Sequence, residues 1–96
     1  MDKVEVIKAI KALEPELRQR GVTKIALYGS VARDEARPDS DIDLLGKVER
    51  GTSLFDVVGI QQFLEEALAH EVHFQVDGSR PSAFRQRIES DLVNVF

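Results

Sequence analysis

The segment Gly29–Leu45 constrains this chain more than any other part of it. It joins a Gly-Ser turn to two aspartates one residue apart, and the apolar run 24–28 precedes the turn directly. Such a run, ended by glycine, is typical of a β-strand. A second strand is predicted over 41–48, after a short helix over 31–35 and a polar loop. The segment therefore predicts two neighbouring strands, with the turn at the end of the first and the aspartates at the start of the second.

Asp41 and Asp43 occupy alternate positions of the second predicted strand. Side chains two residues apart on a strand point to the same face, roughly 7 Å apart along the chain. Ile42 and Leu44 should then point the other way, into the core. Both carboxylates can converge on one Mg²⁺ or on a close pair of ions, because Mg²⁺ prefers hard oxygen ligands and keeps substrate phosphates as further ligands. The pair predicts a metal site.

The Gly-Ser turn offers a binding place for phosphate oxygens. Gly29 lets the backbone approach a phosphate closely, Ser30 adds a hydroxyl, and a helix that follows points backbone N–H groups at an anion. Arg33 and Arg37 can also reach phosphates, although Arg37 fits a solvated loop charge equally well. The Gly-Ser turn and the aspartate pair are each common when they occur alone, so the prediction depends on their combination. A triphosphate that bridges the turn and the metal would place a nucleotidyl group for in-line displacement.

The remaining sequence alternates between helix and strand patterns. Helical spacing predicts a first helix that Pro15 kinks or restarts, and period-two alternation predicts a strand over 72–77. A last helix should begin near Ser82 as N-cap. The tail 92–96 is apolar and fits a short edge strand or an interface. The fold class expected is α/β (α+β), a small mixed β-sheet with helices packed against it. The helical patterns cover 4–17, 54–70 and 82–92.

Length and composition limit the classes of function. The 96 residues fit one domain, 1–96, and the net charge of -4 disfavours a direct nucleic-acid surface. No cysteine is present, so disulfides and thiolate metal sites are excluded, which is compatible with the cytoplasm. No apolar run is long enough to cross a bilayer. We therefore expect a cytoplasmic protein with no membrane contact.

The spacing Gly29-Ser30, ten residues, then Asp41-x-Asp43 resembles the signature of the DNA polymerase β-like nucleotidyltransferase superfamily. The fuller run resembles its minimal nucleotidyltransferase (MNT) branch, small proteins paired with HEPN-domain partners. The resemblance implies a polymerase β-like core, Mg²⁺ and ATP. It also implies an antitoxin that attaches AMP to a tyrosine of a HEPN toxin, a ribonuclease, and hence a hetero-oligomer. The further residues that carry it are Ala32, Arg33, Glu35, Ala36, Arg37, Pro38 and Ser40, with 53–56 and 84–88.

The family adds a third carboxylate from the next strand, and this chain departs from that pattern. The resemblance places His73 at that position, whereas Asp77 lies on the same face roughly 13 Å further along an extended strand. Either Asp77 serves as a metal ligand through a shifted register, or His73 replaces the acid. An imidazole can accept a proton near neutral pH. Equally, His73 can be a polar residue of a half-exposed strand face that has no catalytic role. The catalytic residues expected are Asp41, Asp43 and His73.

The residues, together with what the resemblance implies, leave two functions open. The first is a metal-dependent transferase that moves AMP from ATP to a protein hydroxyl. The second is a catalytically weakened module that neutralises its partner by binding, which the histidine at the acid position favours. A small-molecule nucleotidyltransferase is less well supported, because no second segment is expected to hold an acceptor.

Overall fold

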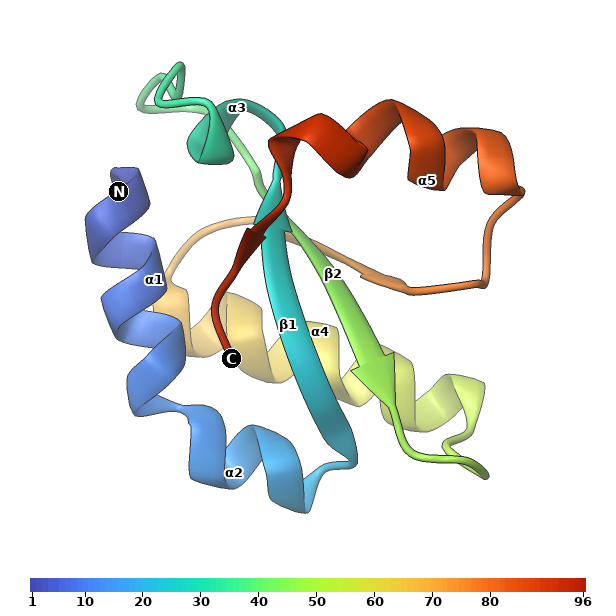
Figure 1. Cartoon of the computed structure of the whole chain (residues 1–96). Coiled ribbons are helices and arrows are strands. Elements are labelled where there is room, and N and C mark those ends of the chain that lie inside the picture. The colour runs from blue at the N-terminus through green and yellow to red at the C-terminus, as the bar shows by residue number, and fades with distance from the viewer.

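The strands of this chain form one mixed sheet in the order β3-β2-β1-β4 (Figure 1). The computed structural model describes residues 1–96. β1 pairs antiparallel with β2 and with β4, whereas β2 pairs parallel with β3. The predicted mixed sheet is confirmed, and the apolar tail is an edge strand. The bounds are β1 Val22–Tyr28, β2 Ile42–Val48, β3 Val72–Val76 and β4 Val93–Asn94.

Helices connect the strands and begin at side-chain caps where the sequence supplies them. Asp2 and Ser53 both form capping boxes, each accepting from a backbone N–H three residues later. Pro15 lies at the start of α2, so the predicted restart of the first helix is confirmed. The predicted N-cap Ser82 is wrong by one position, because Pro81 precedes the helix and Ser82 is its first residue. The bounds are α1 Lys3–Ala12, α2 Glu14–Gln19, α3 Gly29–Ala32, α4 Leu54–Leu68 and α5 Ser82–Ile88, which a 3₁₀ turn, Glu89–Asp91, follows.

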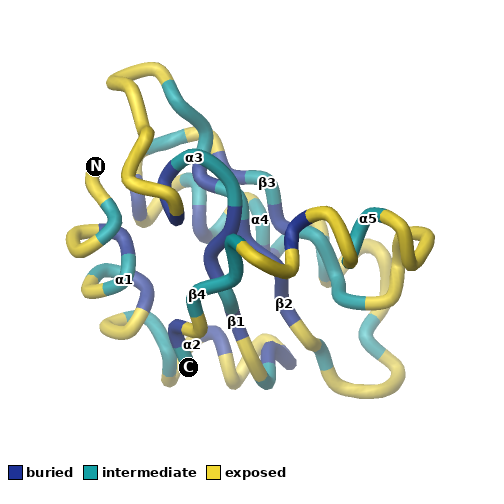
Figure 2. Tube along the Cα trace, turned by 45° about the horizontal axis from the view of Figure 1, so that its top comes forward, coloured by how far each residue is buried: buried dark blue, intermediate teal, exposed yellow.

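Alternation along the strands gives the sheet two different faces. Ile42 and Leu44 are 1% and 0% exposed and belong to the main core, which α1, α2 and α4 complete. The opposite face carries Tyr28 and Leu45, which pack with Ile88 of α5 in a smaller cluster. Figure 1 shows α4 behind the strands, and Figure 2 shows that α5 and the loop after α3 are mostly exposed. The face that carries Tyr28 and Leu45, called here the front face, is therefore covered only in part.

Two side chains of α4 bind the outer edge of β3. The backbone N–H of Val72 donates to Glu65 Oε2 (3.3 Å), and that of Phe74 donates to Gln61 Oε1 (3.1 Å). Glu65 and Gln61 lie four residues apart, on one face of the helix. These bonds hold β3 against α4 and fix the strand that carries His73.

The longest helix, α4, has 15 residues, and none of the helices combines the length and apolar character needed to cross a membrane.

Candidate active site

The candidate active site lies where β1 ends and β2 begins. Tyr28, the last residue of β1, is paired with Asp43, so the turn that follows β1 lies beside that carboxylate. Gly29 has φ +77°, a conformation that L side chains rarely adopt. A Cβ built on Gly29 would overlap Oδ2 of Asp43. Glycine is therefore required here both by the backbone and by the neighbouring carboxylate.

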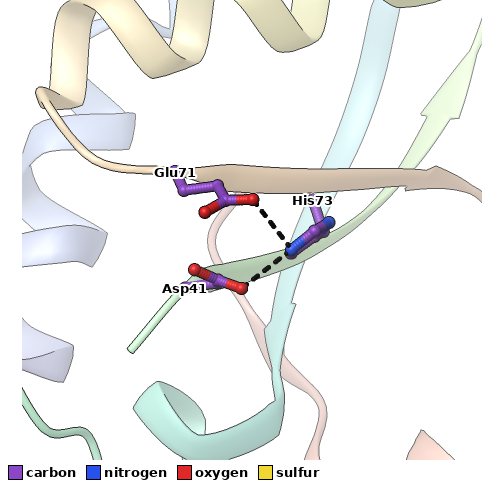
Figure 3. A group of neighbouring side chains, drawn as sticks. All are labelled: Asp41, Glu71 and His73. Atoms are coloured by element: carbon purple, nitrogen blue, oxygen red, sulfur yellow. Dashed lines mark hydrogen bonds and ion pairs between the residues drawn. The ribbon is translucent and has the colours of Figure 1, made fainter. Parts of the chain in front are cut away.

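β3 brings a histidine to the same end of the sheet. His73 is the residue paired with Asp43 in the parallel register. Its Nε2 lies 2.9 Å from Oδ2 of Asp41 and 3.8 Å from Oε1 of Glu71 (Figure 3). The ligand atoms of Asp41, Glu71 and His73 all lie within 4.8 Å of one another. Residues from two strands, far apart in the sequence, thus converge beside the turn.

Burial and charge shift the protonation of this group. Burial raises the pKa of Asp43 above its ordinary value, and the charge of Asp41 raises it further, while His73 and Arg33 act in the opposite direction. The hydrogen bond that the His73 imidazole donates to Asp41 raises the pKa of His73, although partial burial opposes the shift. A bound cation would favour the ionised form of Asp43, which burial disfavours.

Tyr28 forms the apolar wall beside Asp43. The tyrosine is 8% exposed, and its ring meets Phe84 of α5 edge-on, with centroids 5.9 Å apart. Burial raises the pKa of the Tyr28 hydroxyl, and the nearby Asp43 charge adds to that shift. The sheet pairing and α5 therefore limit the water around one side of the carboxylate.

The residues at this end of the sheet fit a divalent cation. Asp41 and Glu71 supply carboxylate oxygens, the ligand type that Mg²⁺ prefers, close to one another and to His73. Asp43, predicted to share a metal with Asp41, lies outside that cluster, and its carboxylate faces the bare backbone at Gly29. His73 contributes a nitrogen ligand or a hydrogen bond to Asp41.

Asp77, predicted as the alternative metal ligand, does not join this group. The β2–β3 register pairs His73, and not Asp77, with Asp43. The N–H of Asp77 instead donates to the carbonyl of Gly46 (2.8 Å), and its Oδ1 lies 3.4 Å from Nε of Arg85. The shifted register that would bring Asp77 to the site is absent.

Arg33, predicted to bind phosphate, is held by two carboxylates. Its Nη1 donates to Oδ2 of Asp91 (2.7 Å), and its Nε donates to Oε2 of Glu35 (3.3 Å). Both hydrogen bonds raise the pKa of Arg33. The side chain is close enough to lower the pKa of Asp43, but in this conformation its donors face acids from the chain.

Sequence reasoning missed three residues around the site. Glu71 could have been found, because it lies two residues before His73 in the period-two pattern. Tyr28 carried a weaker signal as the last residue before the turn. Asp91 carried none, since it is 58 residues away from Arg33 in the sequence.

A mixed sheet that holds a Gly-Ser turn against the carboxylate of Asp43, with Asp41 and His73 at the same end, is the arrangement of a nucleotidyltransferase of the polymerase β-like class. The solved structure of a candidate minimal nucleotidyltransferase has this fold, with a TM-score of 0.82 and 31% identity, covering 97% of this chain and 95% of the other. The chain belongs to the nucleotidyltransferase domain family, whose model matches residues 7–95.

The sequence is also similar to two archaeal proteins over most of their length and most of its own. The protein adenylyltransferase MntA of Thermococcus cleftensis is 33% identical over 92 residues, covering 95% of this chain and 93% of the relative. A candidate protein adenylyltransferase of Methanocaldococcus jannaschii is 37% identical over 81 residues, covering 84% of this chain and 87% of the relative.

Two solved complexes share the fold at lower identity. One is a toxin–antitoxin with AMP-PNP (TM-score 0.75, 19% identity, 100% of this chain and 73% of the other). The second is the tri-AMPylated HEPN toxin of Shewanella oneidensis with its MNT antitoxin (TM-score 0.72, 19% identity, 98% of this chain and 71% of the other). At this identity the likeness concerns the fold.

Proposed function

We propose that this chain is the antitoxin of a HEPN/MNT pair and transfers AMP from ATP to a tyrosine of a HEPN-type partner. The observation that carries the proposal is the contact between Gly29 and Asp43, with Asp41 and His73 at the same end of the sheet. The names of the archaeal relatives supply the protein acceptor, and the Shewanella complex supplies the kind of partner.

The Gly-Ser turn is proposed to bind the triphosphate. The backbone at Gly29 carries no side chain that would block a phosphate, and Ser30 offers its hydroxyl. The first N–H groups of a helix have no intrahelical acceptors, so those of α3 are available to phosphate oxygens. This arrangement would present the α-phosphorus to the acceptor, with the bond to the bridging oxygen pointing away from it, as an in-line displacement requires.

Asp41 and Asp43 are proposed to hold Mg²⁺, with two ions possible. Bound Mg²⁺ would neutralise phosphate charge and stabilise the attacking and leaving oxygens. The Asp43 carboxylate faces the turn at Gly29, and Tyr28, its pairing partner on β1, lies beside it.

A basic group beside the carboxylates would take the proton of the acceptor. In the transfer the tyrosine oxygen bonds to the α-phosphorus, pyrophosphate leaves, and the phenolic proton goes to a base. His73 is the proposed base, because its imidazole accepts a proton near neutral pH. Asp41 orients the imidazole through the 2.9 Å hydrogen bond and stabilises its protonated form.

Transfer of labelled AMP from ATP to the purified HEPN-type partner, in the presence of Mg²⁺, tests this function. We expect label on a partner tyrosine. Asp43→Asn should reduce labelling by more than about 100-fold, because changes to groups that merely support metal ligands already cost about 10–100-fold. Asp39→Ala is the matched control, because this aspartate is exposed in the neighbouring loop. Equal labelling by the Asp43 variant and the parent would exclude the proposed site.

The hydrogen bond between Asp41 and His73 also favours a second function. It occupies one carboxylate oxygen that a metal would otherwise use, and an imidazole brings no negative charge to the site. A weakened enzyme would then inhibit its partner by binding alone. In that case the partner stays unlabelled, a tight complex forms, and Asp43→Asn still inhibits the ribonuclease.

A further inference from the structure

A second concentration of charge lies on the front face of the sheet. A groove of about 250 Å³ runs between β1, β2 and α5. Three cationic side chains line it, Lys24, Lys47 and Arg85, together with one carboxylate, Asp77. The chain as a whole has a net charge of -4. The groove is therefore locally opposite in charge to the rest of the molecule.

The two lysines stand directly opposite each other. Lys24 of β1 is the pairing partner of Lys47 of β2, and like charges placed opposite on paired strands are destabilising. Both side chains are exposed, and neither forms an ion pair or a side-chain hydrogen bond. A β-bulge between Val22 and Lys24 sets this register, because it shifts the pairing by one residue.

Arg85 adds a third positive charge with unused hydrogen-bonding capacity. Its Nε lies 3.4 Å from Oδ1 of Asp77. Its Nη1 is enclosed and has no acceptor, and enclosed donors without a partner are uncommon in native proteins. The three cations and one carboxylate give the groove a formal charge of +2, which matches a phosphate monoester that carries nearly two negative charges at neutral pH.

The groove is separate from the candidate active site. Lys47 lies four residues after Asp43 on the same strand face, roughly 13 Å further along. Leu45 forms the end of the groove floor and packs with Tyr28 and Ile88, which lie on the side toward the turn. Gly29, Ser30 and Asp43 do not line the groove. A ligand in the groove would not touch the Gly-Ser turn.

We propose that this groove binds a phosphate group, as the monoester of a small molecule. Lys24 and Lys47 flank the phosphate oxygens, whose charge relieves the repulsion between the two ammonium groups. Arg85 adds the third positive charge from α5. The volume exceeds that of the phosphate alone, so the esterified group has room along Ala26 and Leu45 on the groove floor.

Amide chemical shifts of the full chain, followed during titration with inorganic phosphate and with glycerol phosphate, test this site. The titration uses magnesium-free buffer, with chloride at matched ionic strength as reference. We expect saturable shifts at Lys24, Lys47 and Arg85, and none of comparable size at Gly29. Lys47→Gln should weaken binding at least about tenfold, because it removes a charge-assisted hydrogen bond.

Lys8→Gln is the matched control, since Lys8 is an exposed lysine of α1 outside the groove. It should leave phosphate binding unchanged. In phosphate-free buffer Lys47→Gln should raise Tm relative to Lys8→Gln, because it removes the opposed like charges. Shifts that do not saturate, that chloride reproduces, or that appear only at Gly29 would overturn the proposal, as would equal affinities of the parent and Lys47→Gln.

Discussion

Replacement of Gly29 by alanine should destabilise this protein through two separable effects. The backbone at Gly29 has φ +77°, and the left-handed conformation costs an L residue about 1–2 kcal/mol. The new Cβ would overlap Oδ2 of Asp43 and lie 3.2 Å from its Cγ, and overpacking of this kind costs about 1–3 kcal/mol. The expected loss in the free energy of unfolding is therefore about 2–5 kcal/mol.

Gly51→Ala separates the two effects. Gly51 has φ +90°, and a Cβ there would meet nothing within 4 Å. This variant should lose only the backbone part, about 1–2 kcal/mol. Urea denaturation of both variants measures the difference. A further cycle with Asp43→Ala removes the carboxylate, after which Gly29→Ala should cost no more than Gly51→Ala.

The reasoning fails if Gly29→Ala is as stable as Gly51→Ala. It also fails if the cost of Gly29→Ala is the same with and without the Asp43 carboxylate, because the contact would then contribute nothing. A coupling of about 1–3 kcal/mol between the two positions would establish that the turn and the carboxylate share one limited space.

Three further changes follow from the same geometry. Because the pKa of Asp43 is raised, ionisation of its carboxyl group opposes folding. Asp43→Asn should therefore raise Tm at neutral pH. The gain in Tm should vanish as the pH falls below 3.8, the ordinary pKa of an aspartate. Because the pKa of His73 is raised, its protonation stabilises the fold fully below 6.5, and this stabilisation is lost as the pH rises through the raised value. Asp41→Asn should lower the pKa of His73 in an NMR titration, and an unchanged midpoint would contradict the role of the hydrogen bond. Gln61→Ala leaves the N–H of Phe74 without its acceptor, which should cost about 0.5–1.5 kcal/mol in urea and speed hydrogen exchange at that amide; unchanged exchange would refute it.

Local patterns were sufficient for the centre of the fold. The run before the turn, the turn itself and the alternation of Asp41, Ile42, Asp43 and Leu44 are contiguous in sequence, and the structure places Ile42 and Leu44 in the core as predicted. The boundaries were less accurate. α3 begins at Gly29 rather than at residue 31, and β1 begins at Val22 rather than at residue 24.

Non-local pairing explains what the sequence could not determine. The choice between His73 and Asp77 depends on the parallel register of β2 and β3, which the packing of α4 fixes across the intervening segment. One of the two carboxylates that hold Arg33, that of Asp91, comes from the other end of the chain. The opposition of Lys24 and Lys47 depends on a bulge that no residue type in the sequence marks.

The bonds from Gln61 and Glu65 to the outer strand have a consequence for behaviour at high concentration. The unpaired backbone N–H and C=O groups of an edge strand can pair with a strand of another protein chain. Such pairing is the first step of many aggregation processes. Here α4 already occupies two of the outward donors of β3, and the opposite margin of the sheet is only two residues long. Few backbone groups are therefore free for strand pairing with another protein at either edge of the sheet. We expect this protein to recognise other proteins through its side chains.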